Sequence, residues 1–148
     1  MKQGYKHFFL VAMAIVLLAA ACSKGGTSTN DDGSGNPHVE NQTDTTAPVV
    51  IINTPLPDQV YTSGTIINVT GRVTDDFGLY RGTIRITNDA NGTLLKEQQY
   101  EIHGLLFYNF NISYTTAVTA VSDYTIRVTF EDHGYNTASR SVKVKVNP

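Results

Sequence analysis

The sequence lacks tryptophan, has a single cysteine, and carries charged side chains at only 16% of its 148 positions. One cysteine cannot form a disulfide within the chain, so a framework of internal disulfides is excluded. The formal net charge of −2 provides no basic field to attract phosphates, and nucleic-acid binding is therefore not expected. The apolar run at residues 8–18 is shorter than the about 20 residues that a membrane-spanning helix needs.

Motifs of common catalytic sites are also missing from the sequence. It contains no nucleophile elbow, no HExxH zinc motif and no glycine-rich phosphate loop. A single small domain offers little concave volume for a substrate. We therefore expect a protein that is not an enzyme.

The first 21 residues have the three-part layout of a secretory signal. Lys2 and Lys6 precede the apolar run, and three alanines follow it directly before Cys22. These alanines and Cys22 resemble the lipobox of bacterial lipoproteins, in which the cysteine is lipidated and becomes the first mature residue. The resemblance implies a signal peptide at 1–21, lipidation of Cys22, and durable attachment to a membrane. The alternative is an ordinary cleaved signal followed by an incidental cysteine.

Residues 22–46 combine Cys22 with a stretch rich in Gly, Ser, Thr, Asn and Asp. This composition cannot bury enough apolar surface to offset its ordering entropy, so it predicts a flexible tether. As a coil, the tether would span about 25–30 Å. The triplet Asp44-Thr45-Thr46 resembles the acceptor site of the Bacteroidota O-glycosylation system, which implies glycosylation at Thr45. The alternative is a plain linker without modification.

Residues 47–148 show the period-two alternation of β-strands and no helical period. In the clearest run, Tyr124, Ile126, Val128 and Phe130 alternate with polar residues. The expected strands are 49–53, 65–73, 79–87, 94–102, 106–114, 122–131 and 138–146, and turn residues separate them. Leu79 is out of phase with the rest of its strand, which predicts a bulge near position 81. Seven strands in about 100 residues predict an all-β, seven-stranded immunoglobulin-like sandwich.

Three segments of this domain resemble bacterial Ig-like repeats of the cadherin-like or PKD-like kind. They are residues 45–50 (TTAPVV), 64–79 (GTIINVTGRVTDDFGL) and 124–136 (YTIRVTFEDHGYN). Together with the lipobox, they make the chain similar to small Bacteroidota lipoproteins that carry one such domain. The resemblance implies an outer-membrane lipoprotein, on the cell surface or the periplasmic face, without an assigned activity.

Acidic residues concentrate at one expected end of the sandwich. If the strands run up and down, the start of the first strand and the turns at 75–78, 103–105 and 132–136 share that end. Asp44, Asp75, Asp76 and Asp132 would then offer the oxygen ligands that Ca²⁺ requires. The alternative is that Asp75 and Asp132 only cap their turns by accepting backbone hydrogen bonds.

Three functions are compatible with these features. The first is a lipid-anchored cell-envelope module with a non-catalytic binding or adhesion role, whose ligand would be a protein or a glycan. The second is a periplasmic structural or accessory subunit that pairs through the strand at 94–102, which is polar on both faces as an exposed sheet edge would be. The third is a Ca²⁺-stabilised adhesion module. Tyr100, on the edge strand, is the best candidate for an exposed aromatic ring that anchors a ligand.

Overall fold

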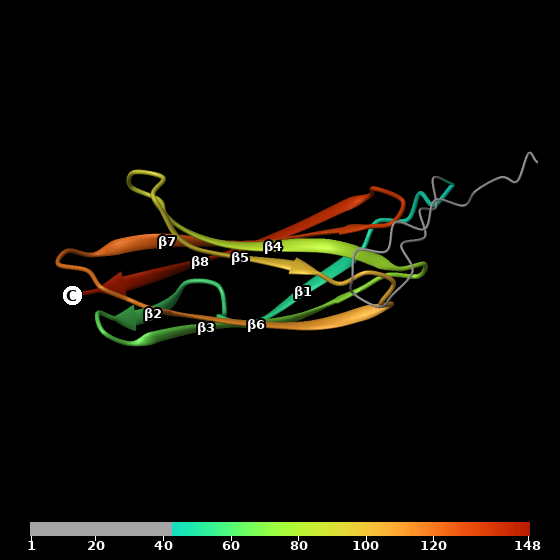
Figure 1. Cartoon of the computed structure of the whole chain (residues 1–148). Helices are drawn as coiled ribbons and strands as arrows, with labels where there is room; N and C mark the ends of the chain where they lie inside the picture. The colour runs from blue at the N-terminus through green and yellow to red at the C-terminus, as the bar shows by residue number, and fades with distance from the viewer. Residues whose placement is uncertain (1–42) are drawn as a thin grey trace, which may run out of the picture.

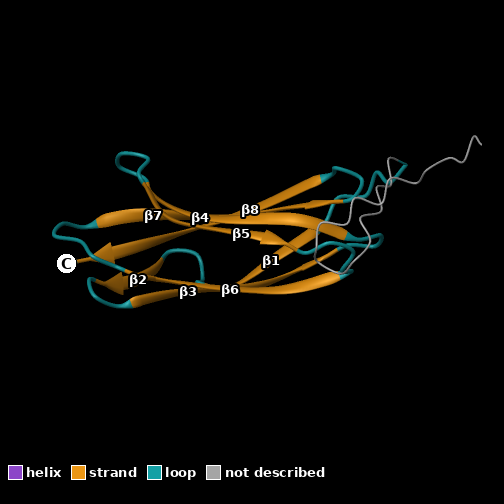
Figure 2. Cartoon of the chain, in the orientation of Figure 1, coloured by secondary structure: helices purple, strands orange, loops and turns teal. Residues whose placement is uncertain are grey.

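The computed structural model describes residues 43–148, and Figure 2 shows strands joined by loops in this part of the chain, with no helix. The predicted signal peptide, Cys22 and the tether up to residue 42 lie outside the described residues. The strands are β1 (Val49–Thr54), β2 (Gln59–Thr62), β3 (Ile66–Thr74), β4 (Leu79–Asn88), β5 (Leu94–Glu101), β6 (Phe107–Thr115), β7 (Ser122–Asp132) and β8 (Thr137–Asn147). Within residues 43–148 there is no helix that is long and apolar enough to span a membrane.

The strands form two sheets that face each other (Figure 1). One sheet has the order β1-β3-β6, and the other has the order β2-β8-β7-β4-β5. Neighbouring strands are antiparallel except β2 and β8, which are parallel. Because β1 and β2 belong to different sheets, the first part of the chain contributes to both layers. The predicted all-β, immunoglobulin-like sandwich is confirmed, with one strand more than the seven expected.

The additional strand is β2, a segment of four residues. Four residues are too few to display a periodicity, so the sequence pattern did not reveal it. Contacts with the last strand hold it in place: Asp58 N donates to Lys143 O at 2.8 Å, and Ser63 N donates to Asn147 O at 2.7 Å. The partner strand lies at the far end of the domain sequence, so β2 is defined by tertiary contacts.

The inner faces of the two sheets carry the apolar residues of the alternating strands. The largest fully buried side chains include Tyr124, Phe110, Phe130, Ile67, Leu79, Ile84, Ile86 and Ile126. The register between β4 and β7 shifts between Leu79 and Arg81, so the predicted bulge is confirmed. This shift lets Leu79 reach the core although its phase differs from that of Ile84 and Ile86.

Two phenylalanines from the facing sheets stack at the centre of the core. The rings of Phe110 and Phe130 lie 5.7 Å apart at 28°. Phe110 is paired with Gly71 across β3 and β6, and Phe130 is paired with Gly82 across β4 and β7. A Cβ atom on Gly71 would lie 2.2 Å from the Phe110 ring, and one on Gly82 would lie 2.2 Å from the Phe130 ring. Each glycine thus leaves space that a ring on the neighbouring strand fills.

Charge is distributed unequally between the two outer faces of the sandwich. On the five-stranded sheet, outward side chains form ion pairs such as Arg81–Glu131 at 3.1 Å and Lys145–Asp123 at 2.9 Å. On the three-stranded sheet, Arg72 is the only charged residue among the outward strand positions. The others are Val49, Ile51, Asn53, Thr54, Ile66, Asn68, Thr70, Thr74, Phe107, Asn109, Asn111, Ser113 and Thr115. We refer to this surface as the neutral face.

Candidate functional site

Four chain segments meet at the end of the sandwich where the described chain begins, opposite the C-terminus (Figure 1). They are the segment before β1 and the β3–β4, β5–β6 and β7–β8 connections. Backbone hydrogen bonds join neighbouring connections, because Gly104 N donates to Leu79 O at 2.9 Å and His133 N donates to Gly78 O at 3.0 Å. The segment before β1 and these three connections therefore share one end of the sandwich, as predicted. We call it the tether end.

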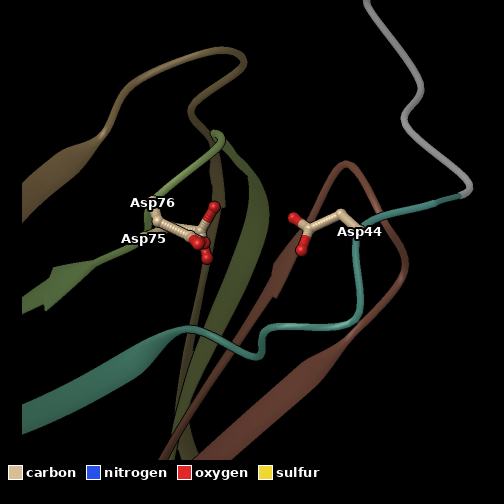
Figure 3. A group of neighbouring side chains, drawn as sticks. All are labelled: Asp44, Asp75 and Asp76. Atoms are coloured by element: carbon tan, nitrogen blue, oxygen red, sulfur yellow. The ribbon is translucent and has the colours of Figure 1, made fainter.

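Three of the predicted acidic residues come together at the tether end. Asp44 lies just before β1, and Asp75 and Asp76 lie in the turn after β3. Figure 3 shows the Asp44 carboxylate facing the other two. One carboxylate oxygen from each of the three residues lies within 4.8 Å of the others. Asp76 is exposed, whereas Asp44 and Asp75 are half-buried.

Each half-buried carboxylate uses one oxygen to cap a turn and leaves the other without a hydrogen bond. Asp75 Oδ2 accepts from Phe77 N at 3.1 Å and from Gly78 N at 2.6 Å. Asp44 Oδ1 accepts from Thr46 N at 2.9 Å. Asp75 Oδ1 and Asp44 Oδ2 are buried and have no hydrogen-bond partner among the described residues. Since buried polar atoms normally have a partner, these two oxygens need an explanation beyond turn capping.

The pKa of the Asp75 carboxyl is raised above its ordinary value. Burial is the main cause, and the nearby charges of Asp132 and Asp44 raise the pKa further. The backbone hydrogen bonds from Gly78 and Phe77 act in the opposite direction. A cation bound beside Asp75 would also act in the opposite direction and favour its ionised form.

The group formed by Asp44, Asp75 and Asp76, which we call the acidic trio, suits a hard divalent cation. Ca²⁺ is bound by six to eight oxygens at about 2.3–2.6 Å, from carboxylates, carbonyls and water. The acidic trio offers carboxylates from two chain segments, including the two oxygens that have no hydrogen-bond partner within residues 43–148. It contains no histidine or cysteine, so its chemistry fits Ca²⁺ better than a transition metal.

Asp132, the fourth predicted ligand, has its carboxylate engaged within the β7–β8 turn. Asp132 Oδ1 accepts from Gly134 N at 2.7 Å and from Asn136 N at 2.9 Å. Asp132 Oδ2 accepts from Asn136 Nδ2 at 3.1 Å. The side chain is completely buried. This geometry matches the capping alternative, and Asp132 does not belong to the acidic trio.

Asn136 connects this turn to the segment that carries Asp44. Its Nδ2 also donates to Asp44 O at 3.0 Å. Gly134 lies against the same segment, because a Cβ atom on it would come within 2.8 Å of Asp44 O. The Asp132–Asn136 turn therefore holds the backbone of Asp44 in place and so positions one carboxylate of the acidic trio.

Two buried histidines pack around Tyr80 at the tether end. The Tyr80 ring centroid lies 4.8 Å from that of His103 and 5.1 Å from that of His133, and the two histidine rings are 5.5 Å apart. His103 Nε2 also lies 3.4 Å from Glu101 Oε2. The group of possible metal ligands within residues 43–148 includes neither histidine. We interpret these rings as packing between the connections.

The two predicted modification sites, Cys22 and Thr45, are not tested by the structure. Cys22 lies outside the described residues, and its lipidation stays a prediction. Thr45 is exposed next to Asp44, and its O-glycosylation also stays a prediction. A hydroxyl at the surface is accessible to a modifying enzyme, but exposure is common to many threonines in this domain.

Tyr100 differs from the expectation of an exposed ring. Its ring centroid lies 5.5 Å from that of Tyr108 and 5.9 Å from that of Phe130. Its hydroxyl is buried and has no hydrogen-bond partner in the described part of the chain. Burial raises the pKa of Tyr100 to about 12. The expectation was wrong because Tyr100 pairs with Gly82 between the inward positions of β4, so its ring lies on the inner side of the sheet and reaches Phe130 in the core.

Two hollows on the outer face of the five-stranded sheet are small. One, of about 230 Å³, is lined by Asp58, Asp89, Asp123, Lys143, Val144 and Lys145. The other, of about 160 Å³, is lined by Thr83, Arg85, Arg127 and Thr129. Ligand pockets usually span about 300–1,000 Å³. In the first hollow, moreover, Lys143 Nζ is paired with Asp89 Oδ2 at 2.8 Å and Lys145 Nζ with Asp123 Oδ1 at 2.9 Å, so both of its lysines already have a counter-charge.

Comparison with known proteins finds similarity in structure only. No protein-family model matches the chain, and no curated protein matches its sequence. Fibronectin(III)-like modules of Clostridium thermocellum CbhA share 15% identity, with a TM-score of 0.45 over 67% of this chain and 96% of theirs. The CARDB domain of the Pyrococcus furiosus PF1109 protein, solved with two metal ions, shares 18% identity. Its TM-score is 0.40, and the match covers 69% of this chain and 93% of that domain. Murine CRIg shares 7% identity with a TM-score of 0.41, and the match covers 69% of this chain and 98% of CRIg.

The described domain belongs to the class of immunoglobulin-like β-sandwiches. The assignment depends on its own two sheets and their strand order, since the similarities are too low to carry an argument about function. No relative therefore assigns a role to the acidic trio or to the neutral face.

Sequence reasoning missed one feature of the tether end, a group of exposed apolar side chains. Leu106 opens the expected strand 106–114 and shares the phase of Phe110 and Ile112, which predicts that it faces the core. However, β6 begins one residue later and Leu106 is 53% exposed. The available signal was the run of three large apolar residues at 105–107, which breaks the period of two.

Proposed function

We propose that the protein is a lipid-anchored module of the bacterial outer membrane that binds a protein or a glycan without catalysing a reaction. The binding role is inferred from the neutral face. Attachment through Cys22 is inferred from the signal-like N-terminus and the lipobox resemblance, and the domain would be held off the membrane by the tether. Whether it faces the cell surface or the periplasm is a matter for experiment.

The neutral face supports binding because of its composition. The centres of protein interfaces are depleted of charge, and this face has one charged residue across three strands. Exposed amides at Asn68, Asn109 and Asn111 can donate to and accept from sugar hydroxyls or a peptide backbone.

The binding role can be tested with one charge placed on each outer face. Asn111→Arg puts a cation in the middle of the neutral face, and Ser141→Arg places the same charge on the outer face of the five-stranded sheet. The probes are an array of neutral glycans and solubilised outer-membrane proteins. We expect Asn111→Arg to weaken retention of a bound probe at least tenfold, with Ser141→Arg unchanged. Equal retention by both variants would contradict the proposal.

Membrane attachment has a direct test in cell fractionation. Cys22→Ala removes the only thiol that could be acylated, so the protein is expected to leave the membrane fraction, whereas Ser23→Ala should remain there. Continued membrane retention of Cys22→Ala would count against lipidation.

The side of the membrane has a separate test in protease treatment of intact cells. Digestion of the domain would place it on the surface, and protection until lysis would place it in the periplasm.

A second proposed function, a Ca²⁺-stabilised adhesion module, is favoured by the unpartnered oxygens of Asp44 and Asp75. Binding of Ca²⁺ to the folded state alone would raise the melting temperature. We expect Ca²⁺ to raise it and chelator to lower it. Asp76→Asn should reduce the shift, while Asp123→Asn, on the outer face of the five-stranded sheet, should leave it unchanged. No shift in the wild type would exclude this function.

The third function, pairing through the edge strand, has less support. β5 is the edge of its sheet, as predicted. However, Lys96 and Gln98 pair with Ile86 and Ile84, whose side chains are buried, so both lie on the inner side of the sheet although they are exposed. An inward-pointing charge on an edge strand discourages pairing with another chain. β5 therefore has the character of a protected edge.

A further inference from the structure

Four large apolar side chains are exposed together at the tether end. Phe77 is 45% exposed in the β3–β4 turn, and Leu105, Leu106 and Phe107 are 40%, 53% and 52% exposed where the β5–β6 loop leads into β6. We call these four residues the apolar tip. Adjacent exposed apolar side chains mark interaction or membrane sites more often than single ones do.

Backbone hydrogen bonds hold the two loops of the apolar tip against each other. Asp75 N donates to Leu106 O at 2.9 Å, and Leu79 N donates to Leu105 O at 2.8 Å. In addition, Thr74 at the end of β3 is paired with Phe107 at the start of β6. The apolar side chains are thus presented on a preformed support, and little ordering entropy remains to be lost when the tip binds.

One cation accompanies the apolar tip. The guanidinium of Arg72 lies 4.6 Å above the centre of the Phe107 ring and forms no ion pair with any described residue. An available guanidinium beside exposed aromatic and aliphatic side chains fits a phospholipid, whose phosphate lies directly above its acyl chains. The nearby acidic trio carries negative charge and therefore disfavours a strongly anionic surface.

The tether end is also where the predicted lipid anchor joins the domain. The chain reaches β1 through Asp44, whose backbone oxygen is held by Asn136 Nδ2 at 3.0 Å. Only 21 residues separate Cys22 from Asp44, so the two can lie at most about 80 Å apart, and a coil would hold them much closer. Attachment at this end raises the effective concentration of the tip at the membrane.

We infer that the apolar tip docks into a zwitterionic phospholipid surface, so that the domain rests end-on against the membrane that anchors it. Phe77, Leu105, Leu106 and Phe107 enter the boundary between head groups and acyl chains, and Arg72 contacts lipid phosphate. The neutral face then stands beside the membrane and stays open to a ligand. The inference depends on the proposed anchorage through Cys22.

The test uses the full lipoprotein, purified with its acyl chains and incorporated into vesicles of phosphatidylethanolamine and phosphatidylcholine. An environment-sensitive nitrobenzoxadiazole label is attached at Leu106→Cys in the tip, or at Val121→Cys, which is 59% exposed at the opposite end next to β7. Because acylation blocks Cys22, each variant has one reactive thiol. We expect the tip label to gain about twofold or more in emission and to be quenched by spin-labelled acyl chains, with no change at position 121.

Further variants separate the possible results. Phe77→Asn in the Leu106→Cys background should lower the emission gain, and Val60→Asn, which changes another exposed apolar residue, should not. Thermal unfolding that matches the parent shows that each variant is folded.

Equal signals at positions 106 and 121 on vesicles that carry the protein would overturn the docking but leave the anchorage intact. A gain without lipid quenching that grows with protein density would assign the tip to a second copy and overturn the inference. Failure to float with the vesicles would refute the anchorage itself, and the docking with it.

Discussion

Replacing Asp132 with alanine is expected to destabilise the domain strongly, although Asp132 was first considered as a cation ligand. The carboxylate is completely buried and accepts hydrogen bonds from Gly134 N, Asn136 N and Asn136 Nδ2 at 2.7–3.1 Å. Truncation removes all three hydrogen bonds, so that Gly134 N and Asn136 N lose their side-chain acceptor and Asn136 Nδ2 keeps only its bond to the Asp44 segment. Because Asn136 also holds the Asp44 backbone, the segment before β1 loosens as well.

The size of the effect follows from these three donors. A buried donor left without a partner costs about 1–3 kcal/mol. Gly134 and Asn136 are partly exposed, so water can replace some of the lost bonds and the lower figure applies to each. We therefore expect Asp132→Ala to lower the free energy of unfolding by about 3 kcal/mol. Asp132→Asn should cost less, because the amide oxygen of asparagine can still accept the hydrogen bonds from Gly134 N and Asn136 N. Some loss remains, because the amide nitrogen cannot accept from Asn136 Nδ2.

Urea unfolding in the presence of chelator measures this loss as a change in midpoint at constant slope. Asp76→Ala is the matched control, since Asp76 is exposed and its replacement should change stability by less than about 0.5 kcal/mol. A loss below about 1 kcal/mol for Asp132→Ala would refute the capping role, because one missing hydrogen bond alone would cost that much.

Two further predictions concern the core. Gly82→Ala should cost about 1–3 kcal/mol, because its Cβ would lie 2.2 Å from the Phe130 ring; an unchanged urea midpoint would show that the ring moves aside freely. Tyr100→Phe should stabilise the domain by about 1 kcal/mol, because it removes a buried hydroxyl that has no partner. A lower melting temperature for Tyr100→Phe would indicate that the hydroxyl is hydrogen-bonded.

Most strands could be predicted because their signal is local. The alternation of Tyr124, Ile126, Val128 and Phe130 places all four on one face of β7, and all four are buried. The misplaced Leu106 and the undetected β2 mark the limit of this reasoning. The alternation of apolar and polar residues shows which residues share a face of a strand. It does not show at which residue the strand begins, or which distant strand pairs with a short segment such as β2.

The candidate site could be predicted only as a collection of residues at one end of the sandwich. Chain order together with antiparallel strands was sufficient to expect Asp44, Asp75, Asp76 and Asp132 near one another. Only the folded chain decides which backbone N–H groups reach each carboxylate. Two of them, together with the side-chain amide of Asn136, engage Asp132, whereas Asp44 and Asp75 each keep one oxygen without a partner among residues 43–148.

By itself, the sequence determined the all-β class, the alternating core strands and the position of most turns, since each depends on neighbours a few residues apart. The tertiary structure decided the pairing of β2 with β8, the burial of Tyr100 and the exposure of the apolar tip. These features depend on contacts between segments far apart in the chain. In the same way, Gly82 leaves space for the ring of Phe130, and that space exists only once β4 and β7 have paired.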